Sequence, residues 1–171
     1  MAGKGSRAGA DRRIAARVLV IEARFYADIS DELAAGAVAE LEARGASFDR
    51  VTVPGALEIP QALMLACAAG LFAGSPLAVA PAPRYAGAVA LGCVIRGETS
   101  HYDIVCNNAH HWLMHVAAMQ HVPVGNGILT VDTREQALAR AQGGRRGKGG
   151  DAVRACLSLV EIARSFQAQG I

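Results

Sequence analysis

The stretch GAVALGCVIRGETSHYD, residues 87–103, determines the fold class of this chain. Residues 87–95 form an unbroken run of apolar and small residues, which is typical of a strand buried on both faces of a parallel sheet. The segment from about Tyr102 to Gln120 has apolar residues at helical spacing. The polar turn between these two segments therefore stands at the carboxyl end of a strand, where open α/β sheets bind their ligands.

Strands and helices continue to alternate on both sides of this unit. Further strands are expected at 17–25, 48–53 and 122–131. Helices are expected over 31–44, 57–70, 134–142 and 151–166, with Ser30 and Thr133 as amino-terminal caps and Gly45 closing the first helix. Because right-handed crossovers place helices on both faces of a parallel sheet, the chain is predicted to be a three-layer α/β/α sandwich. Its four-stranded sheet is expected to have the flavodoxin-like order 2-1-3-4.

The composition indicates one globular domain. A length of 171 residues with 52% apolar residues suits a single core, which we assign to residues 17–171. Residues 1–16 are a basic leader rich in Gly, Ala and Arg and are predicted to be disordered. Much of the excess positive charge lies in this leader, so no nucleic-acid partner is indicated. The chain lacks both a secretory signal core and an apolar stretch of membrane-spanning length, so we expect a cytoplasmic protein with no membrane partner.

The cysteines and clustered histidines favour structural roles. The four cysteines are Cys67, Cys93, Cys106 and Cys156. They are scattered through apolar elements without a C-x-x-C pair, so buried free thiols are expected. His111 and His115 have the i, i+4 spacing that can hold a metal, but no third ligand stands at a matching position. No metal site is therefore predicted.

The polar turn after the strand at 87–95 has two interpretations. Gly97 relieves the backbone, so that the amides of Glu98 and Thr99 can point into the crevice beside a helix start, which is an arrangement that binds anions. Alternatively, the turn is an ordinary helix cap. His101 lies at the mouth of the same turn, and imidazole is the side chain that most readily exchanges protons near neutral pH.

Two other strand ends carry candidate binding groups. Glu58 follows the strand at 48–53, where it either stabilises the helix dipole or joins the amides of Ala56 and Leu57 in binding a polyol chain. Phe25 ends the first strand, where its ring either belongs to the core or stacks on a flat heterocycle.

A glycine-rich segment, GGRRGKGG at 143–150, separates the last two helices. It does not match a phosphate-binding loop, because Gln142 stands where the first glycine belongs and a helix precedes it in place of a strand. Arg140 and Lys148 lie on either side of the bend. They are either the partners of an anion or solvated surface charges.

Several segments together resemble the 6,7-dimethyl-8-ribityllumazine synthase family. These are ARFYADISDELAAGA, VPGALEIP, ALGCVIRGETSHYDIV, GNGILTVDTREQALARA and GKGGDAV, which occur in the order and at the spacings of the family. The resemblance runs from about Val18 to Phe166, with the leader and the 71–86 loop outside it. It implies condensation of 5-amino-6-(D-ribitylamino)uracil with L-3,4-dihydroxy-2-butanone 4-phosphate, releasing phosphate and water, in riboflavin biosynthesis without a metal or organic cofactor.

The resemblance also assigns roles to residues. It implies that His101 is the general acid and base and that Phe25 stacks on the pyrimidine. The ribityl chain is implied to lie against Ala56, Leu57 and Glu58. The uracil edge is implied to pair with the backbone of Cys93, Val94 and Ile95. The phosphate is implied to bind Glu98, Thr99, Arg140 and Lys148.

Asn126 is the largest departure from the family pattern, because many members place there a Phe that reaches over the heterocycle from the neighbouring subunit. Asn126 is kept as an expected site residue with weaker stacking. The resemblance implies a homo-oligomer, a pentamer at least, and an association with riboflavin synthase. The departure leaves open an alternative, a weakly active or inactive member that binds flavin or lumazine or forms a shell.

Overall fold

The computed structural model describes residues 12–77 and 83–170. The strands are β1 Arg17–Ala23, β2 Ser47–Val53, β3 Gly87–Ile95 and β4 Val124–Val131. The helices are α1 Ala27–Arg44, α2 Glu58–Ala68, α3 His101–Met119, α4 Arg134–Ala141 and α5 Lys148–Ala168, with the 3-10 turn η1 Gly144–Arg146 before α5.

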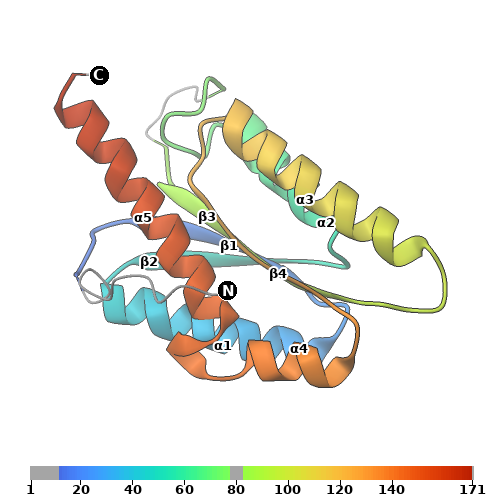
Figure 1. Cartoon of the computed structure of the whole chain (residues 1–171). Helices are drawn as coiled ribbons and strands as arrows, with labels where there is room; N and C mark the ends of the chain where they lie inside the picture. The colour runs from blue at the N-terminus through green and yellow to red at the C-terminus, as the bar shows by residue number, and fades with distance from the viewer. Residues whose placement is uncertain (1–11, 78–82, 171) are drawn as a thin grey trace.

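The four strands form one parallel sheet in the order β2-β1-β3-β4, which confirms the predicted order. Helices α1, α4 and α5 cover one face of this sheet, and α2 and α3 cover the other (Figure 1). The predicted three-layer sandwich is therefore also confirmed. The central strands β1 and β3 are almost fully buried, which explains why they are the most continuous apolar runs in the sequence.

Alternate residues of the central strands fill two separate cores. Val20 and Leu91 pack toward α1, α4 and α5, whereas Ile21 and Ala90 pack toward α2 and α3. This division follows from the two-residue period of a strand, which sends successive side chains to opposite faces. The two layers of helices are thus held by the same pair of strands.

The glycine-rich segment before α5 allows α1 and α5 to approach closely. A Cβ on Gly149 would lie 2.0 Å from the Leu33 carbonyl oxygen, and one on Gly36 would lie 2.6 Å from the Gly144 carbonyl oxygen. Both separations are far shorter than a carbon–oxygen contact. Gly36 and Gly149 therefore allow α1 to pack closely against the start of α5 and the turn before it.

The predicted helix caps differ in outcome. The Thr133 side chain accepts a hydrogen bond from the Gln136 amide, and Gly45 has the left-handed φ of 68° expected after a helix, so both predictions are confirmed. The prediction for Ser30 is wrong, because α1 begins at Ala27. Ser30 is buried in the first turns of the helix, and its hydroxyl lies 2.9 Å from the Tyr26 carbonyl oxygen, satisfied by the backbone of the preceding turn.

The two segments outside the family resemblance are described in part. Residues 1–11 of the predicted leader and residues 78–82 of the 71–86 loop lie outside the described residues. Ile14 is buried in the core, and its amide donates to the Arg44 carbonyl oxygen at 2.8 Å. Within residues 12–77 and 83–170, no helix is both long and apolar enough to cross a membrane.

Candidate active site

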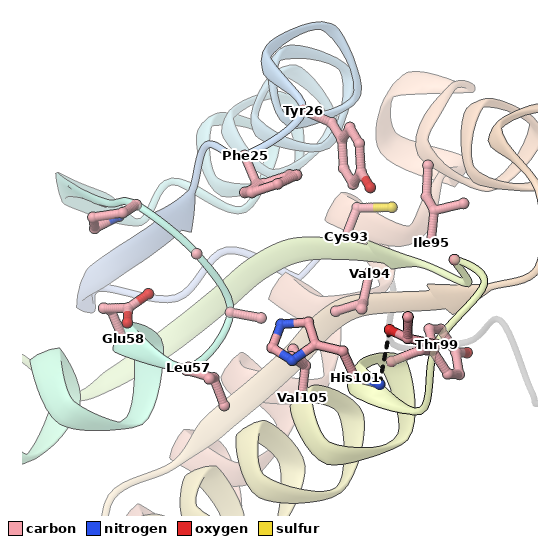
Figure 2. A pocket seen from close by; sticks show the side chains of 15 residues that line it. Phe25, Tyr26, Leu57, Glu58, Cys93, Val94, Ile95, Thr99, His101 and Val105 are labelled. Atoms are coloured by element: carbon pink, nitrogen blue, oxygen red, sulfur yellow. Dashed lines mark hydrogen bonds between the residues drawn. The ribbon is translucent and has the colours of Figure 1, made fainter.

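A cavity of about 390 Å³ opens at the carboxyl edge of the sheet. It lies between the turns that follow β1, β2 and β3, because the carboxyl ends of parallel strands meet at one edge. Its lining includes nine of the predicted site residues. These are Phe25, Ala56, Leu57, Glu58, Cys93, Val94, Ile95, Thr99 and His101. Figure 2 shows Phe25 and His101 on different walls of this cavity, with the end of β3 between them.

The aromatic wall of the cavity is formed by two adjacent rings. Phe25 is 72% exposed, and its ring centroid lies 4.9 Å from that of Tyr26 in an edge-to-face arrangement. An exposed ring held at its edge in this way leaves a face free for a planar ligand. Tyr26 was not predicted as a lining residue, and its position directly after Phe25 was the only sequence signal for it.

The end of β3 presents an unpaired backbone edge. On the β4 side, pairing continues to the last residue, with Ile95 opposite Val131. On the β1 side, pairing stops at Leu91 opposite Glu22. In the part of the chain that the structure describes, no strand therefore pairs with residues 92–95 of β3 on that side. Amide and carbonyl groups at such an edge suit a heterocycle that has both donors and acceptors along its rim.

The Cys93 thiol lies at this strand end but is unsuited to act as a nucleophile. Cys93 is buried, and burial raises the pKa of its thiol to about 11. At neutral pH the group is therefore a neutral thiol, which is a poor nucleophile. The prediction of buried free thiols holds for Cys67, Cys93 and Cys156, whereas Cys106 is only partly buried.

The turn after β3 offers amides and an imidazole to the cavity. His101 is the first residue of α3, and its exposed ring lies beside Val94 and Val105 (Figure 2). Within the part of the chain that the structure describes, the amides of Gly97, Glu98 and Thr99 donate to no other protein group. Free amides at the start of a helix can bind an anion.

Gly97 does not relieve backbone strain in the way the sequence suggested. It has no positive φ, and a Cβ at this position would meet no atom within 4 Å. A side chain here would instead occupy open space at the rim of the cavity. Glycine therefore leaves room for a ligand beside the turn.

The turn after β2 forms a third wall. Glu58 begins α2 and is partly buried, with one carboxylate oxygen 3.1 Å from where a Cβ on Gly55 would stand. The amides of Ala56 and Leu57 donate to no other group among the described residues. The carboxylate and these amides together present acceptors and donors of the kind that hydroxyl groups need.

Four predicted site residues do not line this cavity. Glu98 is an exposed residue of the same turn. Asn126 lies on the edge strand β4, where its side-chain oxygen accepts a hydrogen bond from the Ile128 amide at 3.0 Å. Arg140 is exposed on α4, and Lys148 begins α5 with its ammonium 3.2 Å from Asp151. Within one chain, Asn126, Arg140 and Lys148 are therefore not brought to the cavity, whereas the backbone of Glu98 belongs to the turn that lines it.

The described part of the chain contains no cluster of three or more His, Cys, Asp or Glu side chains that could hold a metal. The His111 and His115 rings stack with their centroids 6.1 Å apart, beside Trp112. Tyr102 and Val105, which line the cavity from α3, were not predicted. Helical spacing from His101 places Val105 one turn further along the same face, so the sequence did carry a signal for it.

The fold and the cavity define a flavodoxin-like α/β protein with a cavity at the carboxyl edge of its sheet, which is where open α/β folds bind their ligands. The family model described as 6,7-dimethyl-8-ribityllumazine synthase matches residues 15–164 of the chain. The chain therefore belongs to the 6,7-dimethyl-8-ribityllumazine synthase family.

Curated relatives agree with this assignment. The 6,7-dimethyl-8-ribityllumazine synthase of Methylorubrum populi is 56% identical over 149 residues, covering 87% of this chain and 83% of the relative. The 6,7-dimethyl-8-ribityllumazine synthase 1 of Rhodopseudomonas palustris is 52% identical over 87% of this chain and 86% of its own length. The enzyme of the same name from Azorhizobium caulinodans is 50% identical, with 87% of each chain covered.

Proposed function

We propose that this protein is a transferase that condenses 5-amino-6-(D-ribitylamino)uracil with L-3,4-dihydroxy-2-butanone 4-phosphate. The products are 6,7-dimethyl-8-ribityllumazine, phosphate and water. The observation that carries the proposal is the single cavity shared by the Phe25 ring, the open end of β3 and the His101 imidazole. Membership of the family supplies the identity of the two substrates.

The pyrimidine substrate matches one side of the cavity. Its flat ring would stack on Phe25, which has an exposed face. Its N–H and C=O groups would pair with the backbone of residues 93–95, where β1 no longer covers the edge of β3. The ribityl hydroxyls would reach Glu58 and the amides of Ala56 and Leu57.

The phosphate-bearing substrate matches the turn after β3. Its phosphate would bind the free amides of Glu98 and Thr99 at the start of α3, and this site would bring the carbonyl near His101. His101 would then move protons during imine formation, phosphate elimination and ring closure. Holding two reactants together can lower a barrier by about 7–11 kcal/mol. One general acid or base adds about 10²- to 10⁴-fold in rate, which corresponds to about 3–5 kcal/mol. Positioning is therefore the larger contribution.

The site is completed by a second copy of the chain. Asn126, Arg140 and Lys148 lie away from the cavity of their own chain, and we assign them to the cavity of a neighbour in a homopentamer. A further cavity of about 770 Å³ lies along α2 and α3. Large apolar side chains are exposed on these helices, at Met64, Leu65, Ile104, Trp112, Met114 and Met119. Exposed large apolar side chains gathered on two helices that pack together are typical of a protein interface.

The direct test of the proposed activity is to incubate the purified protein with both substrates and to follow the fluorescence of the lumazine product. We expect product to form with no added metal or cofactor, together with one phosphate for each lumazine. Tight binding of the pyrimidine substrate or of flavin without turnover would instead identify a binding protein and contradict the proposal.

A shared site predicts complementation between two impaired variants. His101→Ala and Arg140→Ala should each lower the rate, because each removes one half of every site. When equal amounts are co-expressed, random assembly in a ring gives about one quarter of the sites both intact halves, so about one quarter of wild-type activity should return. Activity no higher than that of the two separate variants would show that the site lies within one chain.

We further propose that the enzyme works in the cytoplasm and associates with riboflavin synthase, which follows it in riboflavin biosynthesis. Co-purification of the two proteins from cells would support the association. Separate elution of both, at concentrations well above those in the cell, would contradict it.

A further inference from the structure

The Arg96 guanidinium connects the turn that holds His101 to two neighbouring elements. Its Nε lies 3.1 Å from a carboxylate oxygen of Asp132, which directly follows β4. One terminal nitrogen lies 3.4 Å from Asp103 in the first turn of α3. The Cζ atom of the group also lies over the Tyr102 ring, 4.0 Å from its centroid. Arg96 therefore directly precedes the turn 97–101 and contacts Asp103, which follows it.

We propose that Arg96 is a positioning residue that fixes the 97–101 turn, so that the free amides and the His101 imidazole keep one geometry in the cavity. This inference rests on the proposed function, because it deepens the role of the same turn. Arg96 itself does not line the cavity, and its charged group is already engaged by two carboxylates.

The hydrogen bonds within the turn join only residues that are close in sequence, so a contact with another element is needed to hold the turn in place. The His101 amide lies 3.4 Å from the Thr99 hydroxyl, and the Asp103 amide lies 3.1 Å from the Ser100 carbonyl oxygen. Neither of these bonds joins the turn to another strand. Residues 97–100 are also exposed, so no packed core restrains them. Arg96 connects the turn to the end of β4 through its side chain, which meets Asp132, and through its amide, which donates to the Val131 carbonyl oxygen. Tyr102, directly after the turn, also forms a side-chain hydrogen bond with Thr130 of β4.

The network acts on geometry more than on folding stability. The side chains of Arg96, Asp103 and Asp132 are 45%, 57% and 66% exposed. Exposed ion pairs contribute little to stability because water screens them. A small displacement of a catalytic group can nevertheless cost up to about 10²-fold in rate. Loss of Arg96 should therefore impair function with little effect on the melting temperature.

Arginine suits this role better than lysine. Its planar fork can meet two carboxylates at once and can lie flat on an aromatic ring, whereas a lysine ammonium is a point charge on a flexible chain. Arg96→Lys keeps the charge but loses the simultaneous contacts with Asp103, Asp132 and Tyr102. The variant should recover only part of the lost function.

The experiment compares Arg96→Gln, Arg96→Lys and Asp132→Asn with a matched control, Arg17→Gln. Arg17 is similarly exposed at 42% and is paired with Asp49, but it lies at the amino end of β1, opposite the cavity. The measurements are kcat and KM for each substrate, the Kd of inorganic phosphate and the melting temperature.

Arg96→Gln should lower kcat/KM for the phosphate-bearing substrate by about 10- to 100-fold and weaken phosphate binding. The KM of the pyrimidine substrate, which is held by other walls, should change by less than about threefold. Asp132→Asn should give a smaller loss in the same direction, and Arg96→Lys should lie between Arg96→Gln and the wild type. The melting temperatures of Arg96→Gln and Arg17→Gln should agree to within about 4 °C.

Three results would overturn the inference. One is a loss in Arg96→Gln no larger than that in Arg17→Gln. Another is an equal loss for both substrates accompanied by a lower melting temperature, which would indicate a purely structural role. The third is tighter phosphate binding in Asp132→Asn. This result would show that Arg96, once freed from Asp132, contacts the phosphate directly.

The phosphate measurement separates this inference from the proposed function. If the wild type binds phosphate but forms no lumazine, the proposed function fails, and the change in Kd still decides whether Arg96 positions the turn. If the wild type neither binds phosphate nor forms lumazine, both proposals fail.

Discussion

His101 and Cys93 line the same cavity, but their surroundings suit them to different roles. The His101 ring is exposed to the cavity, where it can exchange protons with a bound substrate. The Cys93 thiol is buried, and burial raises its pKa to about 11, so it remains protonated at neutral pH. We therefore assign proton transfer to the imidazole, and we assign only backbone contacts to Cys93.

His101→Ala should slow turnover without abolishing it. One general acid or base contributes about 10²- to 10⁴-fold, and the remaining catalysis comes from holding the two substrates together. The measurement is kcat from the formation of lumazine under saturating substrates. His121→Asn is a suitable control, because His121 lies beyond the far end of α3 and has a positive φ of 53°, which asparagine tolerates. Complete loss of turnover in a folded His101→Ala variant that binds substrate would contradict this ranking of effects.

At the scale of the element, close helix contact depends on glycines. Gly149→Ala should destabilise the fold by at least about 2–3 kcal/mol, because its Cβ would lie 2.0 Å from the Leu33 carbonyl oxygen and would force α1 and α5 apart. The free energy of unfolding in urea measures the effect. Gly97→Ala is the control, since a Cβ there meets nothing within 4 Å, and it should change stability by less than about 0.5 kcal/mol. Equal stability of the two variants would show that α1 and α5 are not so tightly packed.

A polar contact joins three neighbouring strands at the amino end of the sheet. Asp49 on β2 accepts hydrogen bonds from the Arg17 guanidinium on β1 and from the Tyr85 hydroxyl just before β3. Its pKa is lowered to about 2, mainly by Arg17 and then by Tyr85. The ionised carboxylate is thus favoured in the folded state.

Asp49→Asn should lower stability only slightly at pH 7, because water screens this partly exposed carboxylate, and the difference from wild type should depend on pH. Because the folded pKa of about 2 is below the ordinary value of 3.8, the contribution is fully present above that value and is lost as the pH falls through the range to about 2. Urea midpoints of both proteins at pH 7, 4 and 2.5 test this expectation. Asp31→Asn, which removes another exposed carboxylate paired with an arginine, controls for the loss of charge. A difference that stays constant down to pH 2.5 would contradict the expected linkage.

At the scale of the whole molecule, the exposed apolar side chains of α2 and α3 are covered in the proposed pentamer. Trp112→Glu should reduce the mass in sedimentation from about five times 17.7 kDa toward that of one chain, because it places a charge in an apolar interface. Activity should fall with the mass, since Arg140 and Lys148 would no longer reach a neighbouring cavity. Phe166→Glu, also at an exposed apolar residue but near the end of α5, should leave the pentamer intact. A wild-type chain that sediments as a monomer at micromolar concentration would exclude this model.

The sequence alone was sufficient to predict the order of the elements, the order of the strands and the strand ends that line the cavity. The order of the elements follows from local patterns, namely the two-residue and 3.6-residue periods, and polar turns after buried strands indicated where the cavity would lie. The roles of Phe25 and of residues 93–95 were implied by the family resemblance. The sheet order β2-β1-β3-β4 and the presence of Phe25 and His101 in one cavity agree with those predictions.

Only the tertiary structure showed that residues 92–95 of β3 lie beyond the reach of β1 and so have an open edge. Likewise, it showed that Asn126, Arg140 and Lys148 lie outside the cavity of their own chain, and that Arg96 connects the His101 turn to Asp132. These features depend on how long two strands pair and on which side chains meet across the fold. Such long-range contacts are set by the packing of the whole chain, so no local period in the sequence records them.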